Sequence, residues 1–123
     1  MIINQSYASE KISTLTRSLA KKIESELPMV GYHRELIAEG EAFIASHAER
    51  HICIKVANGI ELSTWQHMWG RKLEEVSYRI DLPTDEKELE YILWIISWLY
   101  EVLLRNPYTS FFDCVFNPRK EVK

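Results

Sequence analysis

The clearest hydrophobic pattern in the chain lies between Thr84 and Asn106. Apolar residues recur there at spacings of three and four, which is the period of one face of an α-helix. One row contains Leu89, Ile92, Ile96, Leu99 and Leu103, and a second row beside it contains Tyr91, Ile95, Trp98 and Val102. Two apolar rows predict a helix that packs on two sides, with a narrow polar stripe that Trp94 interrupts.

Both ends of this helix are marked in the sequence. Pro83 disfavours helix before Thr84, so Thr84 is the predicted N-cap, and Pro107 stops the helix after Asn106. A membrane span would need about 20 largely apolar residues, whereas the uncharged run covers only Tyr91 to Tyr100. The pattern therefore indicates a buried core helix and no membrane crossing.

Two more segments show helical periodicity. Residues 6–26 place Ala8, Ile12, Leu15, Leu19 and Ile23 on one face. The capping-box pattern that begins at Ser63 predicts another helix, with Trp65, Trp69, Leu73, Val76 and Ile80 on a shared face. Pro28 ends the first of these helices and Pro83 ends the second.

The stretch between them has two interpretations. A helix that begins near Tyr32 and runs to about Ala57 is favoured, with Gly59 as its C-terminal cap. The alternative is a small β-hairpin, because residues 52–56 alternate and are followed by Asn58-Gly59. The helix is preferred because the return strand of the hairpin would cover only Ile60 to Leu62, which makes a marginal ribbon.

These elements predict an all-α fold, a four-helix antiparallel bundle with a short aromatic C-terminal arm, as a single helical domain over residues 1–123. The small hairpin around Asn58-Gly59 stays open as an alternative. The arm is the segment that contains Tyr108, Phe111, Phe112, Val115 and Phe116.

Charge and cysteine content narrow the class of function. The net charge is −3, and residues 61–123 carry 11 acidic against 8 basic side chains. This balance disfavours nucleic acid as a partner, since nucleic-acid binding usually needs a basic stripe. The N-terminus lacks the basic flank and apolar run of a secretion signal, and Cys53 and Cys114 are too few for a disulfide framework. A cytoplasmic protein is expected.

Catalytic and metal-binding signals are weak. No phosphate-binding glycine motif or nucleophile elbow is present, so no catalytic residue and no cofactor are predicted. His47 and His51 are four residues apart and would share one side of a helix, which suggests an alternative function as a metal-dependent helical enzyme or sensor. No third ligand is evident, so the prediction is that no metal binds.

Aromatic residues supply the main functional hypothesis. The chain has four Trp, six Tyr and four Phe, more than one small core easily buries, and interfaces are rich in aromatics. The sequence therefore predicts a non-enzymatic protein that docks on another, basic protein and inhibits or neutralises it, a profile shared by immunity proteins, antitoxins and phage inhibitors. A structural homodimer through the central helix is a further alternative. The predicted partner-binding residues are Asp85, Glu86, Glu90, Trp94, Glu101, Phe111, Phe112 and Phe116.

Overall fold

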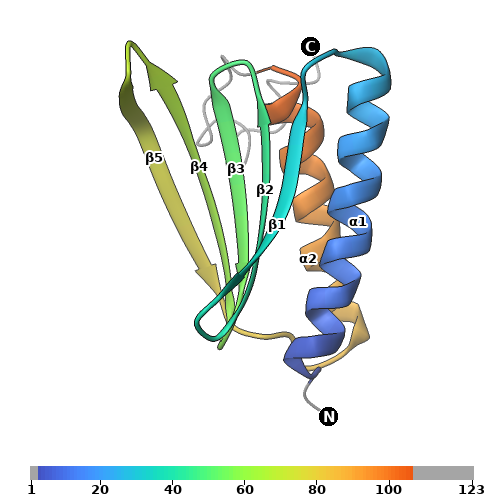
Figure 1. The fold of residues 1–123 in the computed structure, drawn as a ribbon. Coiled ribbons are helices and arrows are strands. Elements are labelled where there is room, and N and C mark those ends of the chain that lie inside the picture. Colours follow the sequence, from blue (N-terminus) through green and yellow to red (C-terminus); the bar gives the residue numbers. More distant parts are fainter. Residues whose placement is uncertain (1–2, 107–123) are drawn as a thin grey trace.

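A computed structural model describes residues 3–106, which form a five-stranded antiparallel sheet with two helices on one of its faces (Figure 1). The elements in chain order are α1 (Gln5–Glu26), β1 (Gly31–Ile37), β2 (Gly40–His47), β3 (Arg50–Val56), β4 (Ile60–Met68), β5 (Arg71–Ile80), α2 (Glu86–Leu99) and the π-helical turn η1 (Tyr100–Leu104). Each strand pairs with the next one along the chain, so the sheet order is β1-β2-β3-β4-β5. The fold is therefore mixed α/β.

The predicted four-helix bundle is wrong. The stretch expected to be the second helix forms β1, β2 and β3, and the stretch expected to be the third helix forms β4 and β5. Val56 pairs with Ile60 across Asn58-Gly59, so the rejected hairpin describes this turn. Its return strand runs to Met68 instead of ending at Leu62.

The error has a physical cause in the residues that face the helices. In β3 and β4 this face carries Ile52, Ile54, Val56, Ile60 and Leu62, all buried, with a period of two. The alternation then continues through the polar residues Thr64 and Gln66, which are also buried, and a hydrophobicity pattern does not detect them.

The hydrophobic pattern also failed to predict the turn between β4 and β5. Trp69 and Gly70 both have positive φ, 52° and 74°, which suits a two-residue hairpin turn and cannot occur inside a helix. The spacing of Trp65, Trp69 and Leu73 fits a helical face only by coincidence, because a turn separates Trp65 from Leu73.

The core lies between the sheet and the two helices. Helix α1 packs on β1, β2 and β3, and η1 packs on β2 and β3 (Figure 1). Phe43 and Ile54 from the sheet meet Ile12 of α1 and Ile96 of α2 in a single buried cluster. Gly40 is required at the start of β2, because a Cβ there would lie 1.9 Å from the carbonyl oxygen of Val56.

The two terminal helices of the prediction are confirmed, with corrections. Helix α1 begins at Gln5, and α2 follows the predicted central helix. The N-cap of α2 is Asp85 instead of Thr84, since the Asp85 side chain accepts a hydrogen bond from the backbone N–H of Glu88. The second apolar row is packed only in part, because Ile95, Trp98 and Val102 are half-buried against the core while Tyr91 is exposed. The aromatic arm lies outside the described residues.

Candidate functional site

A row of three stacked aromatic rings runs along α2, and its last ring, Trp98, is half-buried against the core. The ring centroids of Tyr91 and Trp94 are 6.2 Å apart with planes at 20°, and those of Trp94 and Trp98 are 6.2 Å apart at 13°. Positions 91, 94 and 98 are neighbours on a helix surface because they are three and four residues apart. Tyr91 is 63% exposed and Trp94 is 59% exposed, so two large rings of this row face solvent.

Acidic residues border the aromatic row at the N-terminal end of α2. Residues 81–90 contain five acidic side chains and one basic side chain. A hollow of about 350 Å³ opens between the end of β5 and the start of α2, lined by Ile80, Asp81, Lys87, Glu88, Tyr91 and Ile92. Its lining combines apolar side chains with two carboxylates, Asp81 and Glu88, and one ammonium group, Lys87. We name Asp81, Glu88, Glu90, Tyr91, Trp94 and Trp98 the acidic–aromatic surface.

The predicted partner-binding residues fall into three groups: four exposed residues of α2 and its N-cap, Glu101 in η1, and three Phe residues outside the described part of the chain. Glu86, Glu90 and Trp94 are exposed on α2. Asp85 is exposed too, but its side chain already serves as the N-cap. Whether these four residues contact a partner stays a prediction.

Glu101 has a structural task. It accepts from Arg105 Nε at 2.5 Å and from Lys22 Nζ at 3.3 Å, and Arg105 also pairs with Glu26. These ion pairs join η1 to the C-terminal end of α1. They hold the pKa of Glu101 below its usual range, although burial acts in the opposite direction. Phe111, Phe112 and Phe116 lie outside the described residues.

Sequence reasoning missed three apolar residues on β5. Leu73, Val76 and Tyr78 are paired with Gln66, Thr64 and Leu62 of β4, so they point to the helix side of the sheet. Strand β5 is the one farthest from the helices in Figure 1, and all three side chains are exposed. Once the chain is known to form strands, the alternate spacing of Val76, Tyr78 and Ile80 would have identified this face.

The histidines are arranged differently from the helical prediction. His47 is on β2 and His51 is on β3, where His51 is paired with Ser46. Since neighbouring positions on a strand point to opposite faces, His47 and His51 lie on opposite faces of the sheet. The idea that both rings share one side of a helix is therefore wrong.

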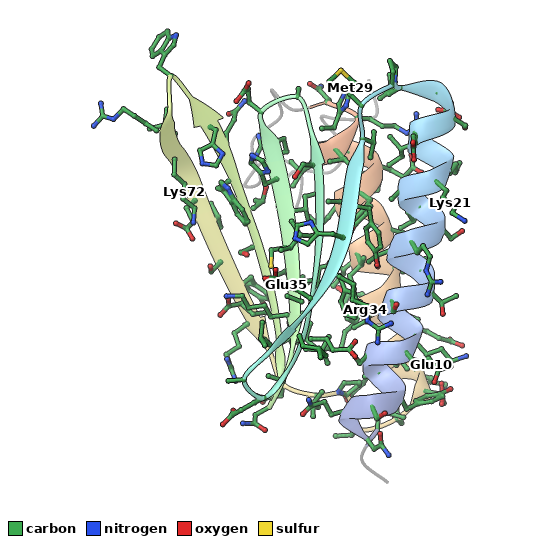
Figure 2. The ribbon with its side chains drawn as sticks, in the orientation of Figure 1. Glu10, Lys21, Met29, Arg34, Glu35 and Lys72 are labelled. Atoms are coloured by element: carbon green, nitrogen blue, oxygen red, sulfur yellow. The ribbon has the colours of Figure 1, made fainter. Side chains whose placement is uncertain are left out.

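His51 instead belongs to a cluster on the face of the sheet away from the helices. Its Nδ1 lies 2.7 Å from Ser46 Oγ, its Nε2 lies 2.9 Å from His67 Nδ1, and its ring stacks on Trp65 at 5.3 Å. Lys72, labelled in Figure 2, completes the cluster with its Nζ 4.6 Å from the Trp65 ring centroid. Burial, and then the neighbouring His67, lower the pKa of His51. Within residues 3–106, no three His, Cys, Asp or Glu side chains are grouped as metal ligands would be.

Two further observations bear on function. Cys53 is a free, buried thiol, and burial raises its pKa, which makes it a poor nucleophile. In the part of the chain that the structure describes, neither helix has the length and apolar character needed to cross a membrane.

No protein-family model, curated protein or solved structure matched the chain when it was compared with them.

Proposed function

We propose that this protein is a non-enzymatic binding protein that docks on a basic protein partner through the acidic–aromatic surface and inhibits or neutralises it. The observation that carries the proposal is the stack of Tyr91, Trp94 and Trp98, in which the rings of Tyr91 and Trp94 are exposed. Exposing two large aromatic rings side by side costs favourable burial, and such clusters are typical of interface hot spots.

The chemistry of the partner follows from the charges beside the stack. Asp81 and Glu88 flank an apolar hollow, so they suit a lysine or arginine whose aliphatic stem enters the hollow. A guanidinium or ammonium group is also attracted to the faces of Tyr91 and Trp94. By occupying the basic site of its partner, the protein would block that site. The proposed setting is the cytoplasm, in keeping with the free thiol of Cys53.

The test compares proteins captured from the native host by three versions of the chain. Trp94→Ala removes the centre of the stack, and Trp69→Asn removes an equally large tryptophan that is 91% exposed at the β4–β5 turn. Asn tolerates the positive φ of that position, so the control should fold. We expect a basic protein that the wild type and Trp69→Asn both retain and that Trp94→Ala loses.

The affinity for the captured protein then quantifies the effect. Trp94→Ala should weaken binding by about 30-fold, which is about 2 kcal/mol, mainly through faster dissociation. Reversing Glu90 should mainly slow association and weaken its salt dependence. Equal capture by all three versions would refute the proposal. A dimer in light scattering that Trp94→Ala dissociates would assign this surface to a second copy instead.

A further inference from the structure

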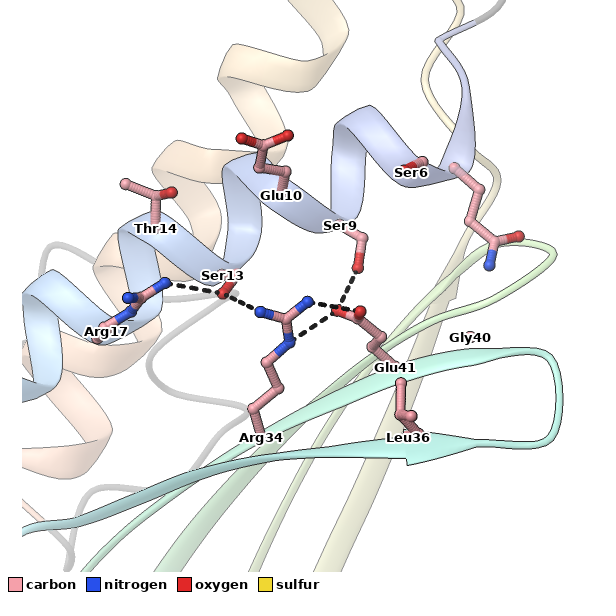
Figure 3. A pocket seen from close by; sticks show the side chains of 11 residues that line it. Ser6, Ser9, Glu10, Ser13, Thr14, Arg17, Arg34, Leu36, Gly40 and Glu41 are labelled. Carbon is pink, nitrogen blue, oxygen red and sulfur yellow. Dashed lines mark hydrogen bonds and ion pairs between the residues drawn. The ribbon is translucent and has the colours of Figure 1, made fainter.

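A second candidate site lies on the other side of the molecule, between α1 and the edge strand β1. A hollow of about 690 Å³ opens there, and Figure 3 shows its lining. Helix α1 lines the hollow with four small hydroxyl residues, Ser6, Ser9, Ser13 and Thr14, and with the longer side chains of Gln5, Glu10 and Arg17. Leu36, near the end of β1, also lines it and is 83% exposed.

One ion pair, between Arg34 and Glu41, lies in the hollow, and the Glu41 carboxylate in it already accepts three hydrogen bonds. Arg34 of β1 donates to Glu41 of β2 through Nε at 3.0 Å and through Nη2 at 2.5 Å. Ser9 of α1 donates to the same carboxylate at 2.9 Å. The bond from Arg34 lowers the pKa of Glu41. Glu41 therefore stays ionised, and it has little remaining capacity for another cation.

Beside this pair, hydrogen-bond donors exceed acceptors. Arg17 Nη2 lies 3.4 Å from Ser13 Oγ, and Arg34 Nη1 lies 3.5 Å from the same oxygen. Both distances are long compared with the usual value of about 2.9 to 3.0 Å. Ser13 is only 2% exposed, so water has little access to its oxygen. Two guanidinium groups thus converge on one neutral hydroxyl, as Figure 3 shows, while Glu10 points away from them. An anion placed here would accept from both arginines.

The adjoining edge of the sheet is open and regular. Every residue of β1 from Gly31 to Ile37 is paired with β2 in unbroken register, and no strand among residues 3–106 pairs with its other edge. The opposite edge of the sheet is protected. Strand β5 has a register shift opposite residues 64–66 and carries Arg71, Lys72 and Arg79, and both features discourage strand addition.

We propose that β1 binds an extended acidic segment of another protein as an added sixth strand. The backbone of that segment would pair with the free edge of β1, and its side chains would alternate between the two faces of the sheet. An Asp or Glu opposite Arg34 would reach Arg17 and the Nη1 of Arg34, whose contact with Ser13 is long, because cross-strand neighbours have Cβ atoms about 5 Å apart. Two residues along, an aliphatic side chain would cover Leu36.

A randomised peptide library displayed on phage provides the probe, with the full chain as the target. We expect enriched peptides that place Asp or Glu two residues from an aliphatic residue. Arg17→Glu should weaken a selected peptide by about tenfold or more, because it removes a charge-assisted donor and adds repulsion. Arg17 takes no part in the Arg34–Glu41 pair, so this variant should fold. Lys21→Glu, one helical turn away, is the control and should bind normally.

Hydrogen exchange separates strand addition from simple anion binding. A selected peptide should protect alternate backbone amides of β1, and its Asn or Gln analogue should bind at least about tenfold more weakly. Enriched peptides without an acidic residue, equal binding by Arg17→Glu, or unchanged exchange in β1 would each overturn the proposal. Protection of β1 without peptide, together with a dimer in light scattering, would assign the edge to a second copy. Trp94→Ala should bind the peptide normally, so this result is independent of the function proposed for the acidic–aromatic surface.

Discussion

Helices α1 and α2 pack on the same face of the sheet. They differ in the residues on their outward sides and in the residues on their sheet-facing sides. The outward side of α1 is covered by exposed charged residues such as Lys11, Lys21 and Glu24, as is normal for a helix in water. The outward side of α2 instead exposes Tyr91 and Trp94. Helix α1 exposes one aromatic ring, Tyr7 at 36%, whereas the two rings of α2 are more exposed and lie beside each other, and partner binding is the explanation that we propose for them.

Their sheet-facing sides differ as well. Helix α2 buries Leu89, Ile92, Ile96 and Leu99. The first half of α1 buries Ser9, Ser13 and Thr16 among its apolar residues, and Ser9 donates to Glu41. Helix α2 is thus held by apolar packing, whereas the start of α1 is held partly by polar contacts beside a hollow. The two helices should therefore respond unequally to mutation and to pH.

The largest expected effect is on the apolar side of α2. Ile96→Ala removes a side chain with no exposed surface and should lower the free energy of unfolding by about 2 to 5 kcal/mol. Ser13→Ala in α1 should cost about 1 kcal/mol or less, because its hydroxyl makes only long contacts. Chemical denaturation of both variants measures the two values. Similar losses at the two positions would remove the distinction between the helices.

A smaller effect is expected at the N-termini. Asp85→Ala removes the cap of α2 and should cost about 1 kcal/mol. The loss should exceed that of Asn4→Ala in α1, where the cap bond to Tyr7 N stands alone. In α2 the cap is reinforced, because Glu88 accepts from the backbone N–H of Thr84 at 2.8 Å while Asp85 accepts from that of Glu88. Thermal unfolding of the two variants tests the order, and a greater loss for Asn4→Ala would reverse it.

The smallest effect concerns pH. The bond from Arg34 places the pKa of Glu41 in the folded state below its unfolded value of about 4.3. This contribution is therefore complete above the unfolded pKa and is lost as the pH falls through the folded pKa. The stability advantage of the wild type over Glu41→Gln should accordingly shrink below about pH 4. Melting temperatures measured from neutral to acidic pH test this, with Glu24→Gln on the outward side of α1 as a control. A constant difference at all pH values would contradict the assignment.

The sequence identified both helices and misjudged everything between them, and the reasons lie in particular residues. Each helix has an apolar row of more than three turns, but the row from Trp65 to Ile80 shows that two strands and a turn can imitate such spacing by coincidence. In β3 and β4 the buried face includes Arg50, Thr64 and Gln66, so the alternation of apolar residues ends before the strands do. The turn at Trp69-Gly70 was likewise invisible, because Trp is rarely a turn residue.

The candidate sites were only partly accessible to the same reasoning. Trp94 stood out because it interrupted a polar stripe on a helix that was placed correctly. Tyr78 and Leu36 did not, since their exposure follows from lying at the two edges of a sheet that was not expected. The hollow beside Arg34 is formed by residues of α1, β1 and β2. The spacing of residues within one segment cannot predict how these three elements pack together.

Site-specific photo-cross-linking in native host cells shows directly whether a partner docks on α2. Benzoylphenylalanine replaces Trp94 in one version of the chain and Lys21, on the outward side of α1, in another. We expect position 94 to form a discrete cross-link to one basic protein, which excess unlabelled wild type suppresses and excess unlabelled Trp94→Ala does not. Position 21 should give no such product. The same product from both positions, or none from position 94 while the chain is folded and expressed, would contradict docking through α2.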